Sequence, residues 1–176
     1  MDKREKIQKI RELIDGLKEL TDGLSGGIGE PLTTEEIQEI EEKLKVKLPE
    51  EYKEFLQTFG SLSVVGLQMI DGHSVIKETR KLREYYPKTF SYNLIPIEED
   101  GYGNYYCVVC DGKDRGKIIF WQHDVYPDQV YPNYPPDKDS DFWIESPDFW
   151  TWLLERLQLI KKEEKEEKQK EEGLLS

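Results

Sequence analysis

The hydrophobic pattern of this chain changes its period at Gly60, and this change limits the fold more than any other feature of the sequence. Before Gly60, apolar residues recur every three or four positions, which is the period of an amphipathic helix. After Gly60, short runs rich in valine, isoleucine and aromatic residues stand between turn sequences, which is typical of strands. Helical segments before Gly60 and strand segments after it predict a single domain that contains both kinds of element.

The helical part contains strong local start and stop signals. An amphipathic helix is expected at residues 3–20, followed by a glycine-rich segment that cannot continue it. The second helix is expected to begin after Thr33, whose side chain caps the first turn, and Glu36 completes a capping box. Pro49 predicts the start of a third helix, which Gly60 ends.

The second part of the chain predicts strands and two further helices. Strands are expected at residues 62–70, 94–97, 104–110 and 117–123, the first with a bulge or close approach at Gly66. Helices are expected at residues 75–86 and from Ser146 onward. The runs at residues 98–101 and 111–116 are typical of turns, and the proline-rich residues 125–136 predict an extended loop or a sheet edge.

These patterns divide the chain into three parts. Residues 1–29 form an N-terminal amphipathic helix and a glycine-rich linker, and residues 30–160 form the folded domain. Residues 161–176 form a charged tail of lysine and glutamate. Because this tail has no apolar face, it is either a solvated helical extension or a frayed end.

Acidic and aromatic residues are concentrated in the same part of the chain. The formal net charge is −12, and residues 98–148 hold 12 Asp and Glu against 4 Lys and Arg. Of the 20 aromatic residues, 17 lie between Tyr85 and Trp152. Such a composition can form a surface that attracts a basic protein and then anchors it. The alternative is a strand-rich half whose aromatics form the core and whose aspartates occupy turns.

The composition also disfavours several classes of protein. An acidic chain repels phosphate backbones, so we expect no direct binding of nucleic acid. The uncharged runs are too short to cross a bilayer, so we expect a cytoplasmic protein that does not bind membranes. Two cysteines cannot form the disulfide framework of a small secreted domain.

The sequence contains few candidates for catalysis. Cys107 and Cys110 have the spacing of a redox pair or of half a zinc site, but on a strand they point to opposite faces, which favours buried cysteines. Asp111 and Asp114, with the His123-Asp124 pair, have the residue types of an acid-base or cation cluster, yet turn chemistry explains them better. Phosphate-loop and nucleophile-elbow motifs are absent from the sequence. We therefore expect no enzyme, no cofactor and no metal.

An ordered set of short motifs spans residues 30–160. The first group is Leu32-Thr33-Thr34-Glu35-Glu36-Ile37, Ile40-Glu41, Leu48-Pro49-Glu50-Glu51-Tyr52-Lys53, Phe55-Leu56 and Phe59-Gly60. The second group is Ile95-Pro96-Ile97, Asp100-Gly101-Tyr102-Gly103, Tyr105-Tyr106-Cys107 and Phe149-Trp150-Thr151-Trp152-Leu153. In this order the motifs resemble the SUKH superfamily (SMI/KNR-like), which includes bacterial immunity proteins of polymorphic toxin systems and fungal cell-wall-synthesis regulators.

The resemblance implies an α+β fold, in which a single domain has a mainly antiparallel sheet of four or more strands packed against helices. It also implies a role in binding proteins instead of catalysis. For the bacterial branch it implies an acidic groove or sheet face that blocks a cognate toxin, often a nuclease or another enzyme. Three segments depart from the family pattern: the helix at residues 3–20, the Tyr/Pro segment at 125–136 and the Lys/Glu tail.

The alternation of side chains along strands predicts a binding surface. In the strand at residues 117–123, Ile118 and Phe120 share an apolar face that is expected to pack on helices, which leaves Trp121 and His123 on the other face. The predicted partner-binding set is Glu98, Glu99, Asp100, Tyr105, Trp121, His123 and Asp124. The alternative places Trp121 in a second core layer under the Tyr/Pro segment and makes His123 a hydrogen-bonded residue at the strand end.

Two functions follow from these features. The first is an immunity protein that neutralises a cognate toxin by occluding its active or substrate-binding surface. A basic nuclease suits a −12 inhibitor best, because the inhibitor can imitate a polyanion. The second is an intracellular scaffold or regulator, in which the N-terminal helix and the Lys/Glu tail recruit partners. The oligomeric state, monomer or homodimer, stays open.

Overall fold

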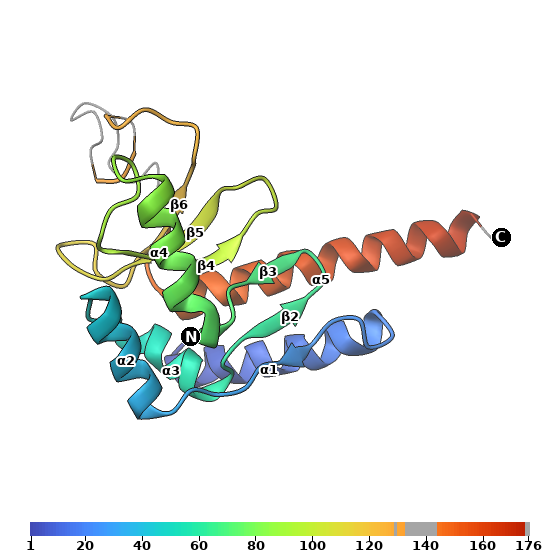
Figure 1. The fold of residues 1–176 in the computed structure, drawn as a ribbon. Helices are drawn as coiled ribbons and strands as arrows, with labels where there is room; N and C mark the ends of the chain where they lie inside the picture. The colour runs from blue at the N-terminus through green and yellow to red at the C-terminus, as the bar shows by residue number, and fades with distance from the viewer. Residues whose placement is uncertain (129, 133–143, 175–176) are drawn as a thin grey trace.

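Apart from one short strand, the chain up to Gly60 is helical, and the other strands follow together with two further long helices, as the hydrophobic pattern predicts (Figure 1). The computed structural model describes residues 1–128, 130–132 and 144–174. Its helices are α1 (Lys3–Leu20), α2 (Thr34–Leu44), α3 (Glu50–Thr58), α4 (Val75–Tyr85) and α5 (Phe149–Leu174), with a 3₁₀ helix at Gly72–Ser74. Its strands are β1 (Gly27–Ile28), β2 (Leu62–Val64), β3 (Leu67–Met69), β4 (Leu94–Glu99), β5 (Tyr105–Val109), β6 (Ile118–Trp121) and β7 (Ile144–Ser146). The predicted α+β class is confirmed.

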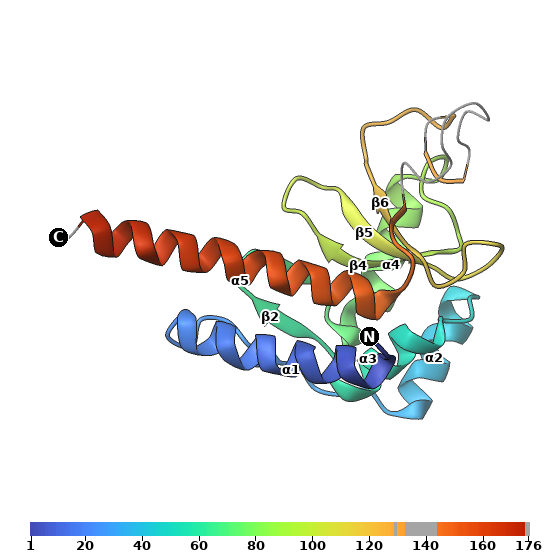
Figure 2. The same ribbon diagram turned by 180° about the vertical axis from the view of Figure 1, so that it is seen from behind.

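The strands form one antiparallel sheet in which each strand pairs with the next along the chain. Figure 1 shows α4 in front of β4–β6, and Figure 2 shows α5 on the opposite side of the sheet. Each face therefore has its own core. The larger core joins α1, α2, α3 and α5 to the sheet, and the smaller core lies between α4 and β4–β6.

The predicted start of α2 is confirmed atom by atom. The Glu36 backbone N–H donates to Thr33 Oγ1 at 3.2 Å, and the Thr33 N–H donates to Glu36 Oε2 at 2.8 Å. Leu32 and Ile37 are both buried in the larger core, as a hydrophobic staple requires. Because all of these contacts lie within six residues, the sequence alone is sufficient to predict them.

The strand predicted at residues 62–70 is wrong as a single strand. β2 and β3 form a hairpin in which Ser63 lies opposite Gln68. Gly66, in the two-residue turn, has a φ of 77°, a conformation that glycine adopts without strain. Gly66 therefore marks a reversal of the chain and not a bulge.

The Tyr/Pro segment is only partly described. Residues 129 and 133–136 of this segment lie outside the described residues, and the others belong to no strand. β7, which follows at Ile144–Ser146, was not predicted from the sequence.

α1 packs on its own domain. It lies beside α5 and runs parallel to it in both views (Figures 1 and 2). Its apolar residues Ile10, Leu13, Ile14 and Leu17 belong to the larger core. α5 continues through the charged segment to Leu174, which confirms the helical extension, and its last turns project beyond the rest of the fold.

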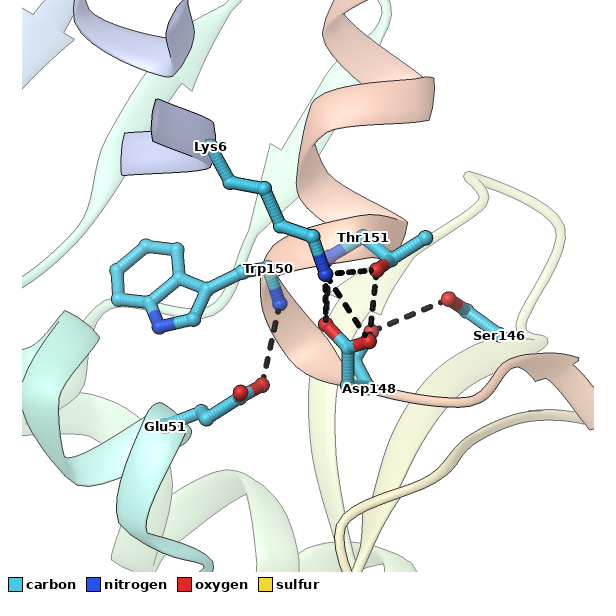
Figure 3. A network of polar contacts seen from close by, with 6 residues as sticks. All are labelled: Lys6, Glu51, Ser146, Asp148, Trp150 and Thr151. Carbon is cyan, nitrogen blue, oxygen red and sulfur yellow. Dashed lines mark hydrogen bonds and ion pairs between the residues drawn. The ribbon is translucent and has the colours of Figure 1, made fainter. Parts of the chain in front are cut away.

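A polar network joins α1 to the start of α5 (Figure 3). The Thr151 backbone N–H and hydroxyl donate to the two carboxylate oxygens of Asp148 at 2.8 and 2.7 Å, so Asp148 caps the helix. Lys6 Nζ on α1 donates to Thr151 Oγ1 at 2.7 Å and pairs with Asp148 at 3.4 Å. From α3, Glu51 accepts a hydrogen bond from the Trp150 N–H at 3.5 Å. The network thus anchors three helices at one helix start.

Candidate partner-binding surface

Trp121 is buried, which corrects the prediction of an exposed side chain. It is 1% exposed and contacts Tyr86 and Phe90 edge-on, with ring centroids 5.0 and 5.2 Å away. Its indole N–H donates to the Thr89 carbonyl at 3.0 Å. The physical reason is that α4 and the segment after it cover this face of β6. The alternative of a second core layer is confirmed, since Tyr131 of the Tyr/Pro segment belongs to the same cluster.

Tyr105 is buried beside Trp121, so it is also no part of an open face. It lies opposite Glu99 on β4 and opposite Trp121 on β6. Burial, followed by the nearby charges of Glu99 and Glu78, raises the pKa of Tyr105 to about 12. The phenol therefore stays protonated at neutral pH.

Glu98 was predicted in an exposed turn, and this placement is wrong. β4 extends to Glu99, and an irregularity in the β4–β5 register between Pro96 and Glu98 places Glu98 opposite Tyr106. There Glu98 is 1% exposed and forms two hydrogen bonds with the guanidinium of Arg156 on α5. Burial raises the pKa of Glu98, although its bonds with Arg156 lower it. Glu98 is therefore an internal anchor for α5.

Asp100 and His123 are brought together through Asn104. The Asp100 carboxylate accepts hydrogen bonds from the Tyr102 N–H at 2.8 Å and from the Asn104 backbone and side-chain N–H groups at 3.1 and 2.8 Å. Burial acts against these bonds, but together they lower the pKa of Asp100. Asn104 Oδ1 accepts the His123 backbone N–H at 3.2 Å and lies 2.9 Å from His123 Nδ1. His123 is thus a hydrogen-bonded residue beyond the end of β6, as the alternative interpretation has it.

The loop at residues 100–104 presents Tyr102 to solvent. Tyr102 is 83% exposed, and the glycines on both sides, Gly101 and Gly103, have φ values of 83° and 88°. A β-carbon on Gly103 would lie 3.4 Å from the His123 ring, so the loop packs closely against the segment after β6. We call residues 99–104 together with His123 and Asp124 the Tyr102 surface.

The Tyr102 surface adjoins the uncovered half of the sheet. Successive strands place the following residues opposite one another in one row: Gly27, Ser63, Gln68, Glu99, Tyr105 and Trp121. Cross-strand neighbours share a face. α4 packs over β4–β6 (Figure 1). On the same face, Ser63 and Gln68 are exposed and Glu99 is half-buried. A polar sheet face therefore continues into the loop that carries Tyr102.

Four of the seven predicted site residues belong to this surface: Glu99, Asp100, His123 and the exposed Asp124. Tyr102 and Asn104 were not singled out from the sequence. The signal for them is the run Asp100-Gly101-Tyr102-Gly103-Asn104, in which an aspartate and two glycines are typical of a tight loop. Tyr102, the aromatic residue inside this run, is exposed to solvent.

The described residues contain no group of three or more His, Cys, Asp or Glu side chains placed to hold a metal ion. Cys107 and Cys110 are both buried, and they belong to the smaller and the larger core respectively, which confirms their opposite orientation. Burial raises the pKa of Cys110 to about 12 and that of Cys107 well above its usual range. Neither thiol is activated as a nucleophile. In the described part of the chain, no helix has the length and apolarity needed to cross a membrane.

Comparison with known proteins identifies the family. The SUKH_5 family model, described as SMI1-KNR4 cell-wall, matches residues 10–158. The chain belongs to the SUKH superfamily. It is also 24% identical over 131 residues to the SPbeta prophage-derived uncharacterized protein YokK of Bacillus subtilis (strain 168), and the match covers 56% of this chain and 67% of that protein.

The structure explains a glutamate of the SUKH signature. Glu41, near the end of α2, is buried and accepts the Leu48 backbone N–H at 2.9 Å. Lys47 pairs with the other carboxylate oxygen at 3.0 Å. Burial would raise the pKa of Glu41, but these partners lower it overall. The carboxylate thus closes the connection between α2 and the proline that precedes α3, so this part of the signature serves the fold.

Proposed function

We propose that this SUKH protein is a non-catalytic, cytoplasmic immunity protein that neutralises a cognate toxin by occluding its active or substrate-binding surface. The observation that carries the proposal is the exposed Tyr102, held on a loop that the Asp100–Asn104–His123 contacts keep in one conformation. A large, preorganised aromatic side chain loses little entropy when it binds a partner. Membership in a superfamily of immunity and regulatory proteins supports the same role.

The charge of the surface supports a basic partner. Glu99, Asp100 and Asp124 belong to the same surface as Tyr102, and the whole chain carries −12. Acidic groups around an aromatic anchor speed the approach of a basic protein and orient it. A nuclease is the toxin class that fits best, because its substrate-binding surface must attract a polyanion.

Replacing Tyr102 with alanine tests the anchor. We expect Tyr102→Ala to weaken the complex about 30-fold, or about 2 kcal/mol, since an exposed aromatic at an interface centre contributes energy of that order. The measurement is titration against the product of a neighbouring gene that encodes a protein with a variable C-terminal domain, together with growth rescue on co-expression. Tyr85→Ala is the matched control, because Tyr85 is also exposed but lies on α4. Equal affinity of the two variants would contradict the assignment of the anchor.

Neutralising the acidic residues tests the electrostatic part. In the double variant Glu99→Gln and Asp124→Asn, we expect a several-fold slower association with that toxin at low salt and a weaker dependence on ionic strength. The dissociation rate should change less than the association rate. An unchanged association rate would contradict the electrostatic part of the proposal, but it would not contradict the role of Tyr102 as the anchor.

The second candidate function is an intracellular scaffold or regulator. The projecting end of α5 favours it, because a charged helix that extends beyond the rest of the fold offers a surface for another protein. Growth rescue separates the two functions. An immunity protein restores growth to cells that express the toxin, whereas a scaffold binds its partner without rescue.

A further inference from the structure

A basic cleft lies between the carboxyl-terminal ends of α2 and α4. The two helices run parallel, since Glu36 and His73 meet near their starts while Arg83 of α4 donates to the Leu44 carbonyl of α2 at 2.9 Å. The cleft has a volume of about 330 Å³. It adjoins a larger cleft of about 630 Å³, and the two share Lys45 and Tyr92.

The charge of the smaller cleft is opposite to that of the whole chain. Four cations line it, Lys43, Lys45, Arg80 and Arg83, against a single glutamate, Glu84. Lys43 pairs with Glu39. In the described part of the chain, neither Lys45 nor Arg80 has an acidic partner. Two cations are therefore free to meet an anion from outside.

The need to stabilise the two helix ends explains why Arg83 lies in this cleft, but it does not explain Lys45 and Arg80. Cations are favourable where the negative ends of two helix dipoles meet. Arg83 fulfils this role, because it donates to the carbonyls of Leu44 and Tyr92 at 2.9 and 2.6 Å. Burial, and to a lesser degree the charge of Arg80, lowers the pKa of Arg83. Arg80 thus repels the residue that already satisfies these carbonyls.

Lys45 occupies a position where its side chain is costly to the fold. It ends α2 in the left-handed conformation, with φ 56° and ψ 44°. Glycine is the residue that this helix-end position favours. A lysine here brings strain and a further positive charge to a cleft that three other cations line, which is easier to understand if the charge has a ligand.

Tyr92 supplies an apolar surface between the two clefts. Tyr92 is 69% exposed, and the guanidinium of Arg83 lies 4.6 Å from the centroid of its ring. The arginine holds the ring in place by a cation–π contact. An extended segment that crosses both clefts would pass over this ring.

We propose that the two clefts bind an acidic segment of a protein partner, with carboxylates on Lys45 and Arg80 and an apolar side chain against Tyr92. Nucleic acid fits less well, because its evenly spaced phosphates would also meet Glu42, Glu84 and Asp111 among the lining cations, whereas a peptide can place its carboxylates at Lys45 and Arg80 alone. The proposal does not depend on the Tyr102 surface, so either one can fail alone.

The test uses a fluorescein-labelled dodecapeptide with six glutamates and a central leucine, and a matched peptide with glutamine in place of glutamate. Anisotropy titrations of the full chain are expected to show binding of the glutamate peptide only, weakening with salt. In Lys45→Gly and Arg80→Gln the affinity is expected to fall about tenfold, which corresponds to about 1.4 kcal/mol. Lys77→Gln is the control, because Lys77 is an exposed cation of α4 that lines neither cleft.

Lys45→Gly separates ligand binding from folding. Glycine relieves the left-handed strain, so its midpoint of thermal unfolding should be unchanged or higher while peptide binding falls. The proposal is overturned if neither peptide binds, if both bind equally, or if the two cleft variants bind as the wild type does. Tighter binding of a single-stranded oligonucleotide than of the peptide would overturn it in favour of nucleic acid. Self-association lost in Lys45→Gly would overturn it in favour of a second copy of this chain.

Discussion

Replacing Gly60 with alanine should destabilise the protein by about 4 kcal/mol or more, from left-handed strain together with a collision in a tightly packed site. Gly60 has a φ of 62° and is buried at the end of α3. A β-carbon there would lie 1.9 Å from the Glu30 carbonyl oxygen. The carbonyl is backbone and the β-carbon is bonded directly to the backbone, so neither can rotate away. The linker before α2 would have to leave its place on the domain.

The matched control for this variant is Gly112→Ala. Gly112 has a φ of 77°, but a β-carbon there would meet nothing within 4 Å. We expect a cost of about 1 kcal/mol, from backbone strain alone. Urea unfolding of both variants measures the difference, which is the cost of the collision with Glu30. Equal losses would show that the linker yields easily and that the closing glycine of the SUKH signature is needed only for its conformation.

Features that depend on neighbouring residues could be predicted from the sequence. The cap of α2 by Thr33 and Glu36 and the stop at Gly60 need only a few residues to form. The amphipathic pattern of α1 gave its length and its buried face correctly. The positions of β4, β5 and β6 also followed from local composition, whereas Gly66 divides one predicted strand into a hairpin, and β1 and β7 were not predicted.

Features that depend on distant residues could not be predicted. Alternation along β6 correctly separated Trp121 from Ile118, but it cannot say what covers each face, and Leu82 and Phe90 come from outside the sheet. The position of Glu98 depends on an irregularity in strand pairing and on Arg156, which lies 58 residues later in the chain. For the same reason Trp121 was predicted on an open face, although it is buried. Trp121 lies in an apolar strand and is buried in the smaller core, whereas Tyr102 lies between two glycines and is exposed.

The second large effect is expected at Arg156. Its guanidinium is the partner of the buried Glu98 and lies 5.3 Å from the centroid of the Tyr106 ring. Arg156→Met should cost about 3 kcal/mol at pH 8, because it leaves an unpaired carboxylate in the core. The double variant Glu98→Met and Arg156→Met should recover most of this loss, since a well-packed apolar pair needs no partner. Lys43→Met, which breaks the exposed pair with Glu39, should cost less than about 0.5 kcal/mol.

The pH dependence of this loss identifies the unpaired charge as its cause. In the wild type the pKa of Glu98 is raised above its ordinary value of 4.5, mainly by burial and against the effect of Arg156. A glutamate whose pKa is higher in the folded state contributes stability at low pH and loses it as the pH rises through the folded pKa. Arg156→Met removes the group that lowers this pKa, so the pKa of Glu98 rises further. The loss of stability then extends to higher pH. The pKa of Glu145, which also interacts with Arg156, is likewise raised by burial.

Urea unfolding at pH 5 and pH 8 should therefore show that Arg156→Met loses less stability at pH 5 than at pH 8. A deficit that is equal at both values would mean that lost packing, and not the buried carboxylate, destabilises the variant.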